Sequence, residues 1–112
     1  NYHITRSQSS SSSYAGSSND NHELIPLADG TGSASSRSAG FNISISNPTS
    51  TTFHKSVHWQ GYSVVANGAE SIAYASGVGH NTSSTAALTG IRIYLNTGNV
   101  NSGTFRLYGI AK

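Results

Sequence analysis

Apolar and polar residues alternate with period two along much of this 112-residue chain. Period two is the repeat of a β-strand, because successive side chains point to opposite faces of a sheet. The pattern is clearest in two runs near the end of the sequence, residues 91–95 and 105–110, which flank a loop of Asn, Thr, Ser and Gly. It predicts a closing β-hairpin with a long polar loop.

The same periodicity predicts an all-β protein, since no stretch carries the spacing of an amphipathic helix. Asn67-Gly68 is a strong hairpin signal. Asn47-Pro48 ends the strand predicted over residues 41–46, and Gly61 allows a bend or bulge between the strands predicted over 51–60 and 62–66. The spacing predicts one module, residues 1–112, built as a jelly-roll-like antiparallel β-sandwich. About eight strands are expected, near residues 2–6, 23–28, 41–46, 51–60, 62–66, 69–79, 88–95 and 104–110.

A serine-rich tract interrupts this pattern at residues 7–21. Its low complexity predicts a long surface loop or a mobile segment between the first strand and the apolar cluster of Leu24, Ile25 and Leu27.

Composition narrows the function classes. Charged residues make up 9% of the chain, against about 25% in ordinary globular domains. The six Lys and Arg residues are scattered, whereas nucleic-acid binders group them, so no nucleic-acid partner is expected. No apolar run is long enough to cross a membrane. With no cysteine and few apolar residues the core is thin, which favours oligomerisation as a source of stability.

Catalytic and metal chemistry find little support in the sequence. A G-x-S-x-G elbow is absent, and the chain has four carboxylates, three of them in its front third. His54 and His58 fall on one predicted strand at a separation of about 13 Å, too far apart for one ion. A histidine repeated on a three-fold axis, His58 or His80, is the remaining metal hypothesis. We expect no enzymatic activity, no cofactor and no metal.

Binding is the more promising chemistry. Carbohydrate sites combine flat aromatic faces with amide and hydroxyl groups, and Trp59, Tyr62 and Tyr74 are the candidate ligand-binding aromatics. Trp59 also shares a predicted strand face with Phe53 and Val57, which favours a core position over a ligand contact.

The predicted closing hairpin carries a second candidate surface. If Ile91, Ile93 and Leu95 face the interior, the outer face holds four polar or aromatic side chains: Arg92, Tyr94, Arg106 and Tyr108. Tyr and Arg are enriched at protein interfaces, and cross-strand Tyr–Arg stacking would place them together. We interpret these four residues as an oligomer interface, with a solvated face and a ligand site as the alternatives.

The last segment, GIRIYLNTGNVNSGTFRLYGIAK, resembles the ending of many tailed-bacteriophage virion proteins, above all in residues 102–110. Residues 53–59, with Gly40-Phe41 before them, look similar to the middle strands of the same family. The resemblance implies a jelly-roll module at a fibre tip or on the capsid surface. Such modules are usually homotrimers that resemble C1q/TNF-like trimers, and they offer no catalytic residues to carry over.

The expected function is therefore that of a non-enzymatic, trimeric module on the virion surface. It would attach to a host-surface glycan or protein, or decorate the capsid by binding other virion proteins. The alternatives are a carbohydrate-binding module of a secreted or virion-associated enzyme and, less favoured, a cytokine-like signalling head.

Overall fold

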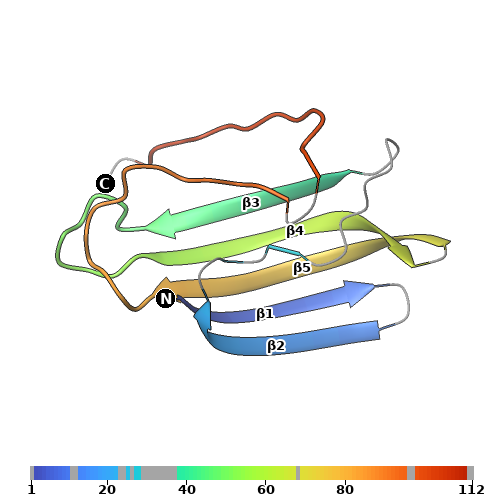
Figure 1. The fold of residues 1–112 in the computed structure, drawn as a ribbon, viewed down its shortest axis with the longest axis horizontal. Coiled ribbons are helices and arrows are strands. Elements are labelled where there is room, and N and C mark those ends of the chain that lie inside the picture. The colour runs from blue at the N-terminus through green and yellow to red at the C-terminus, as the bar shows by residue number, and fades with distance from the viewer. Residues whose placement is uncertain are drawn as a thin grey trace.

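The structure, a computed structural model, describes residues 2–10, 13–22, 25, 27–28, 38–67, 69–95 and 98–110. These residues form one five-stranded antiparallel sheet and contain no helix, so the all-β prediction is confirmed (Figure 1). The strands are β1 (Tyr2–Ser10), β2 (Ser13–His22), β3 (Ala39–Ser46), β4 (Ser56–Asn67) and β5 (Ala69–Asn81).

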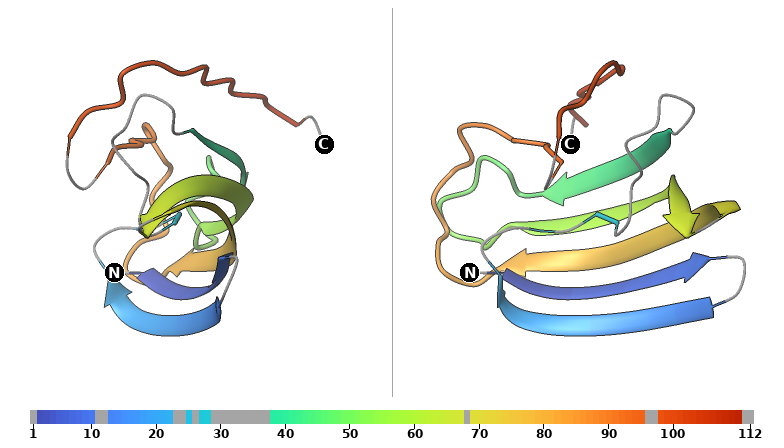
Figure 2. Two further views of the ribbon diagram at one scale, coloured as in Figure 1. Left: turned by 90° about the vertical axis from the view of Figure 1, so that its right-hand side faces the viewer. Right: turned by 45° about the vertical axis from the view of Figure 1, so that its right-hand side comes forward.

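The strand order is β2-β1-β5-β4-β3, which leaves β2 and β3 as the two edges. The end-on view in Figure 2 shows that the sheet is strongly curved. The hairpin predicted at Asn67-Gly68 is confirmed, because β4 and β5 pair from Ser56 opposite His80 to Asn67 opposite Ala69. β3 ends at Ser46, before Asn47-Pro48, as predicted; Asn47 has a φ of 54° there, and its carbonyl accepts from the amide of Ser50.

Residues 7–10 and 13–21 lie in strands, where the sequence pattern predicts a loop or a mobile segment. β1 continues through Ser10, and β2 begins at Ser13. Each pairs antiparallel with the other, with Ser7 opposite Gly16, while β1 also pairs with β5. Because the ladder hydrogen bonds involve only the backbone, a run of serines can form it without any apolar alternation.

Two other strand boundaries differ from the prediction. Residues 51–55 lie outside β4, and residues 56–67 form one continuous strand rather than two separated by a bend at Gly61. A Cβ at Gly61 would lie 2.1 Å from the Gly40 carbonyl oxygen and 2.5 Å from Phe41 Cδ1. Gly61 therefore permits close approach of β3 to β4 instead of bending the chain.

The core lies on one face of β3, β4 and β5, which we call the inner face. Trp59 is fully buried, and its ladder partners are Ile43 on β3 and Gly77 on β5. Small residues from β5, Ala73 and Ala75, complete the core. A bulky indole fits here because the neighbouring strand offers glycine and alanine, whose small side chains leave room for it.

The segment before β3 covers part of the inner face. Trp59 Nε1 donates to the carbonyl oxygen of Leu27 at 3.0 Å, and a Cβ at Gly79 would lie 2.9 Å from Ile25 Cδ1. The predicted apolar cluster thus places the Ile25 side chain and the Leu27 backbone against the inner face, and both residues are half-buried. The described residues 25, 27 and 28 are not in a strand, whereas one was predicted over 23–28.

The predicted closing hairpin is not present among the described residues of the isolated chain. Neither 88–95 nor the described residues 98–110 contain a strand, and Figure 2 shows residues 98–110 standing away from the sheet. The interior positions assigned to Ile91, Ile93 and Leu95 are wrong, because all three are exposed. Alternation marks a sequence that can pair, but it does not specify a partner in the same chain.

Candidate functional site

The outer face of the sheet carries an exposed pair of tyrosines. Tyr62 on β4 lies directly opposite Tyr74 on β5, and both are nearly half exposed. A Cβ at Gly40 would lie 2.9 Å from Tyr62 Cε1, so the Tyr62 ring packs over the backbone of β3. His58 and Val78, another exposed cross-strand pair, lie on the same face. This face presents flat aromatic surface to solvent.

Trp59 does not belong to this outer face. Its position in the ladder puts it on the inner face, where it is fully buried. The core interpretation of Trp59 is therefore confirmed, and of the three candidate ligand-binding aromatics only Tyr62 and Tyr74 meet solvent. The partners proposed for the Trp59 face were partly wrong, because Phe53 precedes β4 and is exposed.

The second candidate surface is the segment 89–110, which we call the C-terminal arm. The turn before it is fixed, because Asn81 Oδ1 accepts from the amides of Ser83 and Ser84. The amide of Leu88 then donates to the carbonyl oxygen of Pro48 at 2.8 Å. Every described residue of the arm beyond this point is exposed.

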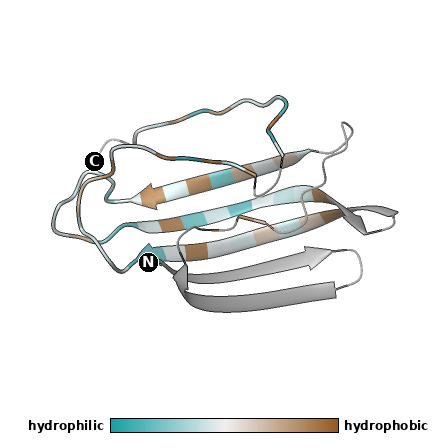
Figure 3. Ribbon diagram, viewed as in Figure 1, coloured by the Kyte–Doolittle hydropathy of each residue, from teal (hydrophilic) through white to brown (hydrophobic). Residues whose placement is uncertain are grey.

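Apolar side chains of the arm are exposed to an unusual degree. Phe105 is 66% exposed, Leu107 87% and Ile110 94%. Figure 3 shows apolar and polar positions alternating along the arm as they do along β3. In β3 the pattern has its expected effect, with Phe41, Ile43 and Ile45 half-buried between exposed Asn42, Ser44 and Ser46. The arm has the same pattern without a surface to cover.

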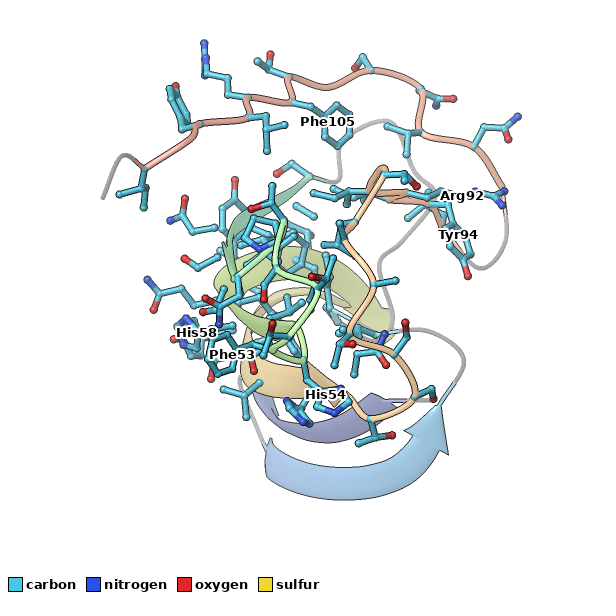
Figure 4. All side chains as sticks on the ribbon, turned by 90° about the vertical axis from the view of Figure 1, so that its left-hand side faces the viewer. Phe53, His54, His58, Arg92, Tyr94 and Phe105 are labelled. Carbon is cyan, nitrogen blue, oxygen red and sulfur yellow. The ribbon has the colours of Figure 1, made fainter. Side chains whose placement is uncertain are left out.

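The four residues assigned to an interface all lie on the arm and are exposed: Arg92, Tyr94, Arg106 and Tyr108. Arg92 Cζ lies 4.9 Å from the ring centroid of Tyr94, within reach of a cation–π contact (Figure 4). This contact joins neighbours on one extended segment, whereas the predicted hairpin placed stacking across two strands. The structure does not bring the 92–94 and 106–108 pairs together in a paired hairpin.

Lys55 is a buried cation that sequence reasoning missed. The side chain is 3% exposed, and Nζ donates to the carbonyl oxygens of Ser50, Phe53 (3.0 Å) and Thr85 (2.6 Å). Three donors meet three acceptors, so the ammonium group is satisfied without a carboxylate. It joins the loop before β4 to the segment after β5, and nothing in the local pattern indicates this tertiary contact.

The side chains of the four carboxylates, Asp20, Glu23, Asp29 and Glu70, lie outside the described part of the structure. Within the described residues there is no group of three or more histidine, cysteine or acidic side chains suited to a metal ion. The described residues also include no helix able to cross a membrane.

The histidines are arranged differently from the prediction. His54 lies before β4 rather than on it, so His54 and His58 do not share a strand, although Figure 4 shows both at the same end of the molecule. His54 instead meets His80 of β5, a tertiary pairing that the sequence spacing did not reveal.

Comparison with known proteins found no matching family model, no matching curated sequence and no matching solved structure.

Proposed function

We propose that this chain is a non-enzymatic module of a bacteriophage virion surface, and that it functions as a homotrimer assembled through its C-terminal arm. The observation that carries the proposal is the exposure of the arm, whose apolar residues alternate with polar ones and are exposed in the isolated chain. Exposed apolar surface of this extent is typical of an interaction site.

The energetics favour assembly. The fully buried apolar core of the described residues consists of Trp59, Ala73 and Ala75, which is small for a free-standing domain. Each large apolar side chain contributes about 1.5–3 kcal/mol when it is fully buried, so covering the arm would add substantially to stability. Burial between copies of the chain would cover the arm without requiring any additional residues.

Assembly also explains the alternating pattern of the arm. Against neighbouring copies, residues 88–95 and 104–110 would form strands and supply the second layer of a sandwich. With β1–β5 the result would be a jelly-roll-like module of seven strands, one fewer than the sequence predicts, with C1q/TNF-like architecture. Arg92, Tyr94, Arg106 and Tyr108 would lie at the subunit interface, where Arg and Tyr commonly contribute most.

The virion assignment rests on the resemblance of residues 102–110 to the endings of phage virion proteins. In that setting the module is exposed on the particle, contacts other virion proteins, and either decorates the capsid or attaches the phage to a host-surface glycan or protein. A trimer repeats each weak contact three times and gains avidity.

The outer face favours a second candidate function, that of a carbohydrate-binding module of a secreted or virion-associated enzyme. Its supporting observation is the exposed Tyr62–Tyr74 pair, since sugar rings pack on flat aromatic side chains. Both functions allow a glycan contact here, but only the first requires the arm to assemble copies.

Light scattering tests the assembly. We expect the native chain to have a mass near three copies of 11.6 kDa at micromolar concentration. Arg106→Ala combined with Tyr108→Ala, and Ile93→Asp combined with Leu107→Asp, should shift it toward the monomer. Phe53→Ser removes an exposed apolar group outside the arm and should leave the trimer intact. A native monomer, or a trimer unaffected by both arm variants, would contradict the proposal.

A glycan array separates the roles. Glycan binding that is lost in Tyr62→Ala and Tyr74→Ala, with the trimer preserved, would support attachment through the outer face. An absence of glycan binding together with tight binding to empty capsids would support decoration. Glycan binding by a monomer would favour the carbohydrate-binding module.

A further inference from the structure

The imidazole rings of His54 and His80 meet at one end of the sheet. Their centroids are 5.3 Å apart, their planes are inclined by 60°, and both residues are exposed. A metal ion bound tetrahedrally by two imidazoles, at about 2.0–2.1 Å from each nitrogen, places the ring centroids about 5 Å apart. The observed separation therefore allows the two histidines to share one ion.

Ser56 supplies a partner for the ring nitrogen that such an ion would not use. Its Oγ lies 3.2 Å from His80 Nδ1, and Ser56 is directly opposite His80 in the β4–β5 register. When Nδ1–H donates to the hydroxyl oxygen, Nε2 carries the free lone pair that binds a metal. A hydrogen bond of this kind on the second nitrogen is the usual way in which metal-binding histidines are oriented.

The backbone holds both histidines in place. The amide of Asn81, the residue after His80, donates to the carbonyl oxygen of Lys55, the residue after His54, at 2.9 Å. Lys55 is itself fixed through its three carbonyl acceptors. Little ordering of the chain is then needed when an ion binds, which favours affinity.

A third histidine position falls in the same row of the sheet. In the β1–β5 register His3 is opposite His80, so three of the five histidines of the chain belong to one end of the sheet. The sequence spacing relates only His54 to His58 on one predicted strand, and it does not indicate this pairing across strands.

We propose that His54 and His80 bind a divalent transition-metal ion, with Ser56 orienting His80 and solvent completing the coordination shell. Imidazole nitrogen suits Zn²⁺, Ni²⁺ and Cu²⁺, whereas Mg²⁺ and Ca²⁺ prefer oxygen ligands. The site lies where the loop before β4 meets the end of β5, away from the C-terminal arm, and does not depend on the trimer.

Titration calorimetry with ZnCl₂ and with NiCl₂ tests the site on the full chain. We expect one ion per chain, a tenfold or greater loss of affinity in His54→Ala and in His80→Ala, and a loss of about tenfold in Ser56→Ala. His58→Ala, an exposed histidine of the same face whose ladder partner is Val78 rather than His80, should bind as the native chain does, and MgCl₂ should give no binding. Nitrogen-15 spectra of the imidazoles should show Zn²⁺-dependent shifts at His54 and His80.

Three results would overturn the proposal. The first is native affinity for Zn²⁺ in both His54→Ala and His80→Ala, with circular dichroism showing that the variants are folded. The second is perturbation by Zn²⁺ of His58 in place of His54 and His80. The third is one ion per two or three chains, which would indicate an ion bridging copies.

Discussion

The Nζ of Lys55 donates to the carbonyl oxygen of Thr85 at 2.6 Å, across thirty positions of sequence. Two further carbonyl oxygens, of Ser50 and Phe53, share the same ammonium group. A single side chain thus joins the loop before β4 to the segment that leads from β5 to the C-terminal arm, and it fixes the chain on either side of His54.

Replacing Lys55 tests this junction. Lys55→Met keeps most of the apolar stem but removes the ammonium group, so three carbonyl oxygens lose a charged donor. Hydrogen bonds to charged groups contribute about 1.5–3 kcal/mol each, and the losses at one site overlap, so we expect unfolding free energy to fall by about 2–4 kcal/mol. Urea denaturation measures the change. A loss below about 0.5 kcal/mol, the range of ordinary surface substitutions, would contradict this role.

Gly61 and Gly90 differ in the space around their Cα atoms, so the same substitution at the two positions makes a matched test. A Cβ at Gly61 would meet the Gly40 carbonyl oxygen at 2.1 Å and the Phe41 Cα at 2.9 Å, and both are backbone atoms that cannot rotate away. Gly61→Ala should therefore separate β3 from β4 and cost about 3 kcal/mol or more, as severe overpacking does.

Gly90→Ala is the control, because a Cβ there meets nothing within 4 Å. It should leave stability unchanged within about 0.5 kcal/mol or raise it slightly by restricting the unfolded chain. Thermal unfolding of both variants, followed by circular dichroism, makes the comparison. Equal effects from the two substitutions would show that the tight β3–β4 approach does not hold in solution.

The part of the fold that the sequence predicts best is β3, β4 and β5. Phe41, Ile43 and Ile45 alternate with polar residues on an edge strand, and these three apolar residues are half-buried, as the two-residue period predicts. Asn67-Gly68 identifies the β4–β5 hairpin because few other dipeptides suit such a turn. These signals are local, and a local pattern is sufficient where each strand pairs with its neighbour in sequence.

The rest of the structure depends on contacts that no local pattern encodes. Ser7 pairs with Gly16 through backbone groups, so the β1–β2 ladder has no side-chain signature. The alternation from Ile91 to Ile110 predicts pairing, but within the described residues this segment pairs with no strand of the sheet. The His54–His80 contact joins residues 26 positions apart through the β4–β5 pairing, and only the register reveals it.

Ser63 is fully buried on the inner face, and among the described residues its Oγ has no hydrogen-bond partner. A buried hydroxyl without a partner costs about 1–3 kcal/mol of desolvation. Ser63→Ala removes the hydroxyl and keeps the Cβ, so we expect stability to stay level or to rise by about 1 kcal/mol. Chemical denaturation tests this, and a loss of more than about 1 kcal/mol would indicate that the hydroxyl is paired in solution.

Trp59 is the one tryptophan of the chain, so its fluorescence reports on the inner face alone. Because the indole is fully buried and Nε1 donates to the carbonyl oxygen of Leu27, the folded chain should emit at short wavelength and resist quenching by acrylamide. Trp59→Phe removes that hydrogen bond and leaves a cavity beside Gly77, which should lower unfolding free energy by about 2–4 kcal/mol. Tyr62→Phe, on the opposite face, keeps the aromatic ring and should change stability by less than about 0.5 kcal/mol. Solvent-like emission from the native chain, or equal stability of the two variants, would show that the indole does not form the core.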